Sequence, residues 1–421
     1  MLSLAALAMS CGAGTVAPTP CMSDRECRGD RICHQGACMF EEEARAAMQE
    51  QLAGGPTEGG TPTEGTSAGG EDPTPAPVVL RELPMFMGGP THAGRSERRG
   101  PAHAPQVAWT HRTGARVFAS PVVGPDGTVY VGSLDRTFRA IAADGTLRWR
   151  YTGQDRFYST AALTPDGTVV VGCHDRSVIA LSAAGQTRWR RELGAAVDSS
   201  PVVAPDGTIY VTADGLYALD PQGNVLFHHA APDALRSSPA IHPDGFVVYG
   251  STDGRIVAVR ADGQLAWEAR VHSSVESTPS VGPDGTIYVG TDRGQLVALF
   301  ANGTERWRYE IGSDVRGTPA IASDGTVIVG AYDGQVHAVD ESGHRRWVAH
   351  ASGRIRASAR IDADGRVYVG SQDDHLYAIG PDGAALWDRN MGADIDSTVA
   401  FGPDGTIYVG VDDGGVYALR E

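Results

Sequence analysis

The chain has 421 residues, of which 41% are hydrophobic and 20% are charged, and its 54 glycines and 25 prolines predict many turns and short strands. This composition does not suit a bundle of membrane-spanning helices. All 35 basic residues are arginines and are outnumbered by 51 acidic residues, so the formal charge of −16 argues against nucleic acid as a partner.

Residues 1–20 contain an apolar stretch, Met1–Ser10, that ends at Cys11-Gly12. This pattern resembles the end of a bacterial lipoprotein signal, which implies export and a lipid on Cys11 as the first mature residue. Two features depart from it, because Ala8 stands where such signals usually carry leucine and no arginine precedes the apolar run. A start upstream of Met1 would explain the missing charge, and a disordered apolar N-terminus is the alternative.

Residues 21–38 hold four cysteines separated by five, five and four residues, namely Cys21, Cys27, Cys33 and Cys38. Structural zinc sites favour pairs two to four residues apart, and the first two gaps are wider. Behind an export signal, two disulfides in a module too small for its own core are the better interpretation. The four cysteines allow three disulfide connectivities, and the sequence does not choose between them. The segment also resembles short four-cysteine modules of secreted bacterial proteins.

Residues 39–80 form a polar segment followed by a spacer, and residues 81–105 lead into the rest of the chain. The spacer, Leu52–Val79, has no aromatic residue and is rich in Gly, Pro, Thr and Glu, so it is expected to be a flexible linker. A linker of about 28 residues reaches about 30 Å on average, enough to hold a folded body clear of a membrane surface.

Residues 106–421 repeat one pattern eight times, in steps of 40 residues apart from a single step of 38. The pattern is anchored by an Asp-Gly turn, whose aspartates are Asp126, Asp166, Asp206, Asp244, Asp284, Asp324, Asp364 and Asp404. Each unit reads like SPVVGPDGTVYVGSLDRTFRAIAADGTLRWRY, with alternating strands between turns. Four antiparallel strands in about 40 residues are typical of one propeller blade. We therefore predict an all-β, eight-bladed β-propeller.

Tryptophans indicate how this ring closes. Six units carry a tryptophan 23 residues after the turn aspartate, and Phe227 replaces it in the shortened unit. The eighth unit ends at Glu421 before its fourth strand, whereas Trp109 precedes the first unit. We expect Val107–Thr110 to supply the missing strand and close the ring, which leaves no open edge between first and last blade.

The repeat resembles the pyrroloquinoline quinone (PQQ) type propeller repeat, with its YVGS-x-DG and DG-x-x-x-W signatures, and residues 85–114 resemble the lead-in of bacterial members of that family. The enzymatic members hold PQQ and calcium against a pair of adjacent cysteines. This chain has no adjacent cysteines and no long insertions, and Cys173 is expected to be a small buried residue. These departures from the enzymatic members favour a non-enzyme without a cofactor.

No metal site is expected either. The turn aspartates, for instance Asp362 and Asp364, are interpreted as acceptors of backbone hydrogen bonds, because calcium needs six to eight converging oxygens. The histidines occupy unrelated repeat positions, and His174, His228 and His229 are interpreted as surface or turn residues.

Two positions before the first strand of each unit are expected to lie at the central channel of the propeller. One carries a hydroxyl in every unit and is expected to bond backbone: Ser120, Thr160, Ser200, Ser238, Thr278, Thr318, Ser358 and Thr398. The other, two residues earlier, varies and should form a ring at one mouth: Phe118, Tyr158, Asp198, Arg236, Glu276, Arg316, Arg356 and Asp396. The ring is either a set of self-neutralising rim residues or a recognition surface, apolar at Phe118 and Tyr158 and cationic at Arg316 and Arg356.

We therefore expect a non-catalytic binding or scaffold protein of the cell envelope, similar to the propeller lipoprotein of the outer-membrane barrel-assembly machinery. It would be exported, monomeric, and lipid-anchored to the outer membrane on the periplasmic or surface side, with another envelope protein or peptide as partner. A PQQ- or metal-dependent oxidoreductase and a carbohydrate-binding surface protein are the alternatives.

Overall fold

The computed structural model describes residues 31–34, 37–40, 84–233 and 235–421, which belong to two compact units, Met1–Asp72 and Pro73–Glu421. In the first unit, β1 (Arg31–His34) pairs antiparallel with β2 (Ala37–Phe40), and Cys33 lies opposite Cys38 in the register. The predicted lipidation site Cys11, together with Cys21 and Cys27, lies outside the described residues. The disulfides therefore stay a prediction.

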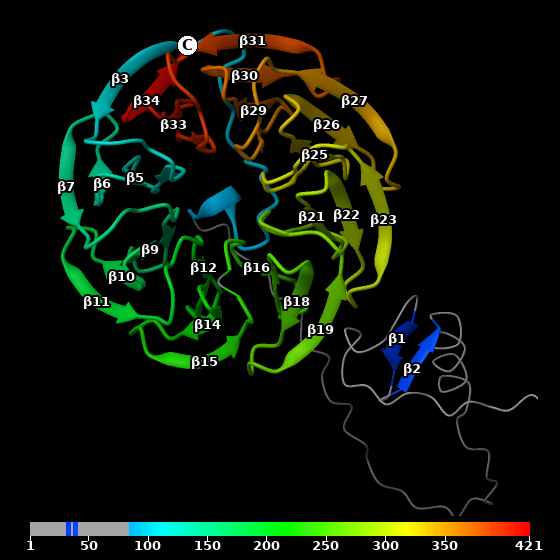
Figure 1. Cartoon of the computed structure of the whole chain (residues 1–421). Coiled ribbons are helices and arrows are strands. Elements are labelled where there is room, and N and C mark those ends of the chain that lie inside the picture. The colour runs from blue at the N-terminus through cyan, green and yellow to red at the C-terminus, as the bar shows by residue number, and fades with distance from the viewer. Residues whose placement is uncertain (1–30, 35–36, 41–83, 234) are drawn as a thin grey trace, which may run out of the picture. The chain divides into compact units, whose positions relative to one another are not determined.

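The second unit is a ring of eight four-stranded antiparallel blades, as predicted (Figure 1). The innermost strands are two residues long: β4 (Val122–Val123), β8 (Ala162–Leu163), β12 (Val202–Val203), β16 (Ala240–Ile241), β20 (Ser280–Val281), β24 (Ala320–Ile321), β28 (Arg360–Ile361) and β32 (Ala400–Phe401). The second strands are β5 (Val129–Gly132), β9 (Val169–Cys173), β13 (Ile209–Thr212), β17 (Val247–Gly250), β21 (Ile287–Gly290), β25 (Val327–Gly330), β29 (Val367–Gly370) and β33 (Ile407–Gly410).

Two further strands complete each blade. The third strands are β6 (Thr137–Ile141), β10 (Ser177–Leu181), β14 (Gly215–Leu219), β18 (Arg255–Val259), β22 (Gln295–Leu299), β26 (Gln335–Val339), β30 (His375–Ile379) and β34 (Gly415–Arg420). The outer strands are β7 (Leu147–Thr152), β11 (Thr187–Glu192), β15 (Val225–Ala230), β19 (Leu265–Arg270), β23 (Glu305–Glu310), β27 (Arg345–His350), β31 (Ala385–Asn390) and β3 (Gln106–Arg112). We number the blades 1 to 8 in the order of their innermost strands, β4 to β32.

Ring closure occurs as predicted, because β3 pairs with β34 and completes blade 8 in the sheet order β3-β34-β33-β32. In Figure 1 the C-terminus lies beside this seam.

Two features of the Asp-Gly turn explain why it recurs in every blade. Gly127 has φ +77°, which glycine adopts without strain, and Asp126 accepts a hydrogen bond from the backbone N–H of Thr128 over 3.1 Å.

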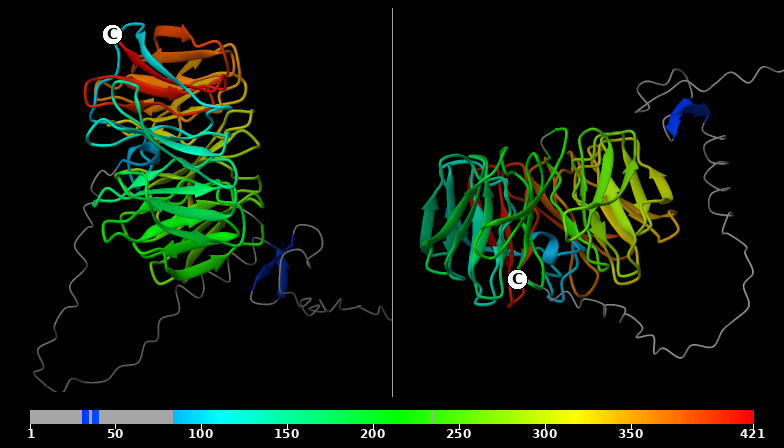
Figure 2. Two further views of the ribbon diagram at one scale, coloured as in Figure 1. Left: turned by 90° about the vertical axis from the view of Figure 1, so that its left-hand side faces the viewer. Right: turned by 90° about the horizontal axis from the view of Figure 1, so that it is seen from below.

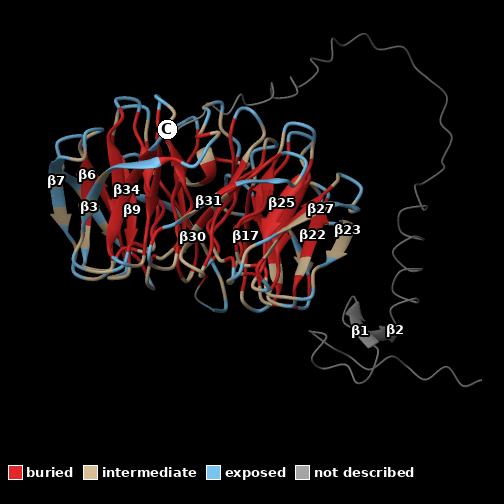
Figure 3. Cartoon of the chain, turned by 90° about the horizontal axis from the view of Figure 1, so that it is seen from above, coloured by how far each residue is buried: buried red, intermediate tan, exposed pale blue. Residues whose placement is uncertain are grey.

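The core lies between neighbouring blades, where the middle strands are buried on both faces and the outer strands alternate between half-buried and exposed residues (Figure 3). This pattern explains the runs of Val, Ile and Ala in the middle strands. Tryptophans of the outer strands reach across to the next blade. Trp149 Nε1, for example, donates to the carbonyl oxygen of Ala183 over 2.8 Å.

The lead-in segment, residues 84–105 as described, passes across the centre of the ring and contains the short 3-10 helix η2 (Phe86–Gly88) (Figures 1 and 2). It hydrogen-bonds to the innermost strands of blades 2, 4, 5, 6 and 7, for instance from Leu163 N to Pro84 O and from Ile361 N to Gly94 O, both over 2.9 Å. Met85, Met87 and His92 of the segment are buried. No helix among the described residues is long and apolar enough to cross a membrane.

Candidate functional site

The eight variable ring residues all line one cavity of about 490 Å³ on the propeller axis. They lie in the loops that precede the innermost strands, rather than in those strands, because each innermost strand is only two residues long. Each blade therefore contributes one side chain at an equivalent backbone position. Phe86 of the lead-in segment also lines the cavity.

The eight hydroxyl residues line the same cavity and join neighbouring blades. At six places the backbone N–H of one of these residues donates to the hydroxyl of its equivalent in the next blade, over 2.9–3.1 Å. The contact from Thr398 N to Ser120 Oγ, 2.9 Å long, crosses the seam between blade 8 and blade 1. Six of the eight hydroxyls thus bond backbone, as predicted, and link the loops that carry the ring residues.

One side of the cavity is aromatic. The rings of Phe118 and Tyr158 meet edge to face, with centroids 5.7 Å apart and an interplanar angle of 77°. His174 continues this wall, with its ring centroid 5.6 Å from that of Tyr158. Its Nδ1 lies 2.7 Å from Oδ1 of Asp198. The turn position expected for His174 is correct, and its side chain additionally faces the cavity, whereas His228 and His229 lie on the outer strand β15.

A second sector is ionic and largely self-neutralised. Glu276 accepts from Arg236 over 3.1 Å and lies 3.3 Å from Arg316. Arg316 also lies 3.2 Å from Asp292 and 3.5 Å from Asp314. Burial raises the pKa of Asp292, although the positive charge of Arg316 opposes this shift. The cationic sector expected at Arg316 and Arg356 is therefore divided, because carboxylates compensate the charge of Arg316.

Arg356 has a different environment. Its guanidinium lies 4.4 Å from the centroid of the Phe118 ring, which belongs to blade 1, whereas Arg356 belongs to blade 7. Blade 8, which lies between these two blades in the ring, contributes Asp396, whose Oδ1 accepts from Gln372 Nε2 over 2.9 Å. Burial raises the pKa of Asp396, against the effect of this hydrogen bond.

A second repeat position, which was not predicted from the sequence, faces the cavity or its ring residues. His174, Asp292 and Gln372 follow the second strands of their blades, and each contacts the ring residue 24 positions further along, in the next blade. Across the seam, Asp412 occupies the equivalent position but accepts from Arg116, two residues before the ring residue Phe118, over 2.8 Å. This turn position changes from unit to unit, but so does the residue before it, so the repeats alone did not single it out.

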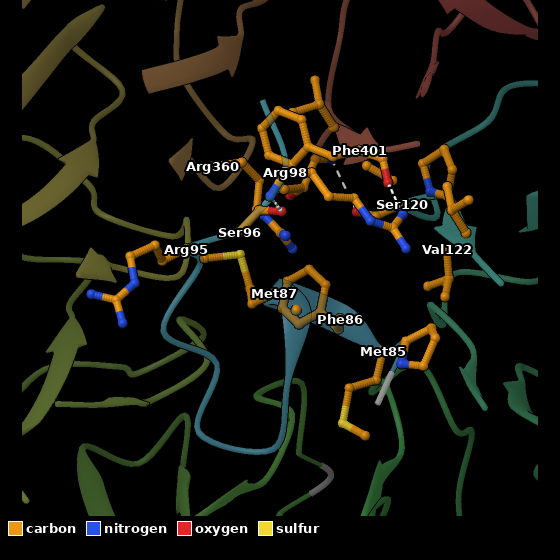
Figure 4. Close-up of a pocket in the computed structure, with 17 residues that line it drawn as sticks. Met85, Phe86, Met87, Arg95, Ser96, Arg98, Ser120, Val122, Arg360 and Phe401 are labelled. Atoms are coloured by element: carbon orange, nitrogen blue, oxygen red, sulfur yellow. Dashed lines mark hydrogen bonds between the residues drawn. The ribbon is translucent and has the colours of Figure 1, made fainter. Parts of the chain in front are cut away.

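A second, smaller pocket of about 130 Å³ lies where the lead-in segment passes blades 8 and 1 (Figure 4). Met85, Phe86 and Met87 form one wall, and Arg98 Nη1 donates to Phe401 O over 2.5 Å. Ser120 and Thr398 line both pockets, as does Phe86. The lead-in segment thus separates the channel-mouth cavity from this pocket.

The side chains of Cys173 and Asp362 have structural rather than chemical roles. Cys173 is fully buried, and burial raises the pKa of its thiol to about 12. Oδ1 of Asp362 accepts from the backbone N–H groups of Asp364 and Arg366, both over 2.9 Å, and Oδ2 accepts from Gly100 N over 3.1 Å. The carboxylate therefore serves as a hydrogen-bond acceptor for a turn and for the lead-in segment.

The sequence profile of the family described as outer membrane protein assembly factor BamB matches residues 102–184, 156–280 and 252–381. The three matches run from residue 102 to residue 381, more than half of the chain. The chain belongs to the BamB family. No curated protein sequence gives a significant match.

Solved structures show the same fold at low identity. BamB from Moraxella catarrhalis is 19% identical, with a TM-score of 0.65 over 75% of this chain and 100% of that chain. A europium-containing methanol dehydrogenase is 15% identical, with a TM-score of 0.66 over 78% and 89%. A quinohemoprotein alcohol dehydrogenase from Comamonas testosteroni is 16% identical, with a TM-score of 0.68 over 82% and 81%. The BamB family fold is thus shared with enzymes, and the site must decide the function.

The cavity of this BamB family member fits PQQ poorly. The cofactor is a planar tricarboxylate, which needs a flat slot and several free cations. Here the Phe118 and Tyr158 rings stand at 77° to each other, and Arg356 covers the face of Phe118. Three carboxylates, those of Asp198, Glu276 and Asp396, line the same cavity and would repel the anion.

Proposed function

We propose that this protein is a non-catalytic binding or scaffold protein of the cell envelope, and that it holds a protein or peptide partner at the channel mouth. One observation carries the proposal. Eight side chains of five types project into one cavity from eight equivalent backbone positions, over a belt of hydroxyls that is nearly the same in every blade. A constant frame that presents a non-repeating set of side chains suits recognition of one partner.

The chemical types at the mouth support the same function. Aromatic residues and arginines are enriched at binding hot spots, and Phe118, Tyr158 and Arg356 stand together on one side of the cavity. The opposite side is held by the ion pairs of Glu276, so it is preorganised and needs little reordering when a partner binds.

Membership of the BamB family supports a place at the outer membrane and a protein partner there. We further propose that residues 1–20 carry an export signal with a lipid on Cys11, that residues 21–38 form a disulfide-linked module, and that residues 39–80 form a spacer. The protein would then be a monomer held at the membrane by its lipid alone, facing the periplasm or the cell surface.

Photo-crosslinking in intact cells tests this function. A photoreactive amino acid would replace Tyr158 in the cavity or, as a matched control, Leu147, which is 44% exposed on outer strand β7. We expect a discrete crosslinked envelope protein from position 158 and none from position 147, identified by mass spectrometry. Equal crosslinking from both positions, or crosslinking from position 147 alone, would contradict binding at the channel mouth.

The oxidoreductase alternative predicts a different result. Purified protein titrated with PQQ and calcium would then show a change in the cofactor's absorption spectrum and reduction of a dye when alcohols are added. We expect neither change, because the cavity lacks a flat slot between parallel rings.

A further inference from the structure

Among the described residues, Arg356 is the one charged side chain lining the cavity that makes no hydrogen bond and no close ion pair, although its charge acts on nearby Asp396 and opposes the rise in the pKa of that carboxyl. The others are all engaged. Arg116 bonds Asp412, and Arg236 and Arg316 contact Glu276. Asp198 contacts His174, and Asp396 accepts from Gln372. Carboxylates outside the cavity lining also compensate Arg316, namely those of Asp292 and Asp314, which leaves Arg356 as the least compensated arginine of the cavity.

The packing of Arg356 leaves its donors available. The guanidinium carbon lies 4.4 Å from the centre of the Phe118 ring, within the range of a cation–π contact. This contact uses none of the five N–H donors of the guanidinium, and none of them donates a hydrogen bond to a described residue, so they are available to a ligand. A planar guanidinium edge matches a carboxylate, which can accept two parallel hydrogen bonds from it.

The surroundings of this edge are apolar on one side. Phe118 and Tyr158 form the wall beside it, and Phe86 of the lead-in segment lines the same cavity. A ligand whose carboxylate met Arg356 could therefore place an adjoining apolar group against aromatic surface. The cavity of about 490 Å³ has room for such a group.

We infer that Arg356 and the Phe118–Tyr158 wall form a binding site for a carboxylate attached to an apolar group, as found at the C-terminus of a peptide or in a small organic acid. This inference rests on the proposed function and adds the ligand chemistry of the same cavity. The carboxylate bonds the guanidinium edge, and the apolar group packs against Phe118 and Tyr158.

Calorimetric titration of the full chain with matched probes tests the inference. The probes are N-acetyl-glycyl-phenylalanine with a free carboxylate, the same dipeptide as its C-terminal amide, and phenylacetate. We expect the free acid to bind at least about tenfold more tightly than the amide, because the charge-assisted hydrogen bonds are lost in the amide. Binding of the dipeptide acid alone identifies a peptide terminus as the source, and equal binding of phenylacetate identifies a small acid.

Variants distinguish specific binding at Arg356 from non-specific attraction of an anion by positive charge. Arg356→Gln should lower the affinity for the free acid about tenfold or more. Arg356→Lys should recover only part of this affinity, because lysine cannot form two parallel hydrogen bonds to a carboxylate. Arg354→Gln is the matched control, since Arg354 lies 5.7 Å from the Tyr332 ring and outside the cavity lining. It should leave the affinity unchanged.

Equal affinities for acid and amide, or an Arg356→Gln variant that binds the acid as the unmodified chain does, would overturn the inference. So would the absence of binding at millimolar probe. A crosslinked partner that still forms from position 158 under these results would leave the proposed function standing, so the two failures can be told apart.

Discussion

The indole nitrogen of Trp387 donates a hydrogen bond to the carbonyl oxygen of Pro101 over 3.1 Å. In the earlier blades the equivalent donor reaches the third turn of the next blade, as from Trp307 to Glu341 O over 2.8 Å. Blade 8 has no such turn, because its outer strand β3 comes from the other end of the repeat region. The lead-in segment thus supplies the missing acceptor and completes the seam.

Trp387→Phe should therefore lower the free energy of unfolding by about 1 kcal/mol, because the ring stays while its hydrogen bond is lost. The chain itself uses phenylalanine at the equivalent position, Phe227 of blade 3. Chemical denaturation followed by circular dichroism measures the change. Trp307→Phe removes the equivalent bond between two neighbouring blades and should lower the free energy of unfolding by a similar amount. If Trp387→Phe lowers it much less than Trp307→Phe does, the bond to Pro101 does not stabilise the seam.

Ser120→Ala should destabilise the propeller by about 1 to 3 kcal/mol, because the buried N–H of Thr398 would lose its acceptor. Ser120→Thr keeps the hydroxyl and is used by the chain at the equivalent Thr160. We expect this control to unfold at nearly the denaturant concentration of the unmodified chain. If the alanine and threonine variants are equally stable, the belt does not hold the seam.

The ion pair between Arg139 and Asp135 predicts a pH dependence. The two side chains are 9% and 12% exposed, with Nη2 2.5 Å from Oδ2. Burial disfavours the charged carboxylate, but hydrogen bonds from Arg139, Thr137 and Gly114 outweigh it and hold the pKa of Asp135 well below its ordinary range. The pair therefore adds stability above the unfolded pKa of about 3.9, and this stability is lost as the pH falls below that value.

Asp135→Asn should cost about 3 to 5 kcal/mol at neutral pH, because it leaves Arg139 buried without a countercharge. Unfolding of the variant should also depend less on pH below about 4 than unfolding of the unmodified chain. Urea titrations across that pH range provide the measurement. An unchanged pH slope in the variant would exclude Asp135 as its source.

His92 predicts a second pH dependence, in the lead-in segment. It is fully buried, and burial lowers its pKa to about 3, although the carbonyl oxygen of Pro279, as an acceptor, opposes this shift. The unfolded chain takes up a proton near pH 6.5 and the folded chain only near pH 3, so stability should fall as the pH drops below about 6.5. His92→Asn removes the titration and suits the backbone, since φ at this position is +52°.

We expect the His92→Asn variant to lose less stability than the unmodified chain between about pH 6.5 and pH 4. Limited proteolysis of residues 84–105 follows the same change locally. Parallel pH profiles for the two proteins would show that His92 does not link the lead-in segment to pH.

The sequence predicted most of the fold, because one pattern recurs in every blade. The Asp126-Gly127 turn and its seven equivalents placed the blades, and the unmatched Trp109 placed the closing strand. The role of the lead-in segment was not predictable. Its backbone hydrogen bonds reach five blades far apart in the chain, and residues such as Met87 and His92 follow no repeat that would indicate burial.

The candidate site was predictable in its membership but not in its pairing. Repeat position alone placed all eight ring residues at one cavity. Which charges are compensated depends on side chains from another turn and from the next blade, such as Asp292 beside Arg316. The stacking of Arg356 on Phe118, two blades away, depends on side-chain length and direction, which the repeat spacing does not contain.

The most direct test of binding at the channel mouth is the affinity of the crosslinked partner for purified variants. We expect the Phe118→Ala, Tyr158→Ala double variant to bind at least about tenfold more weakly, because truncation of aromatic hot-spot residues typically costs this much or more. The Leu147→Ala, Leu226→Ala double variant, whose leucines are 44% and 57% exposed on outer strands, should bind as the unmodified chain does. Full affinity in the cavity variant together with lost affinity in the outer-strand variant would contradict the account.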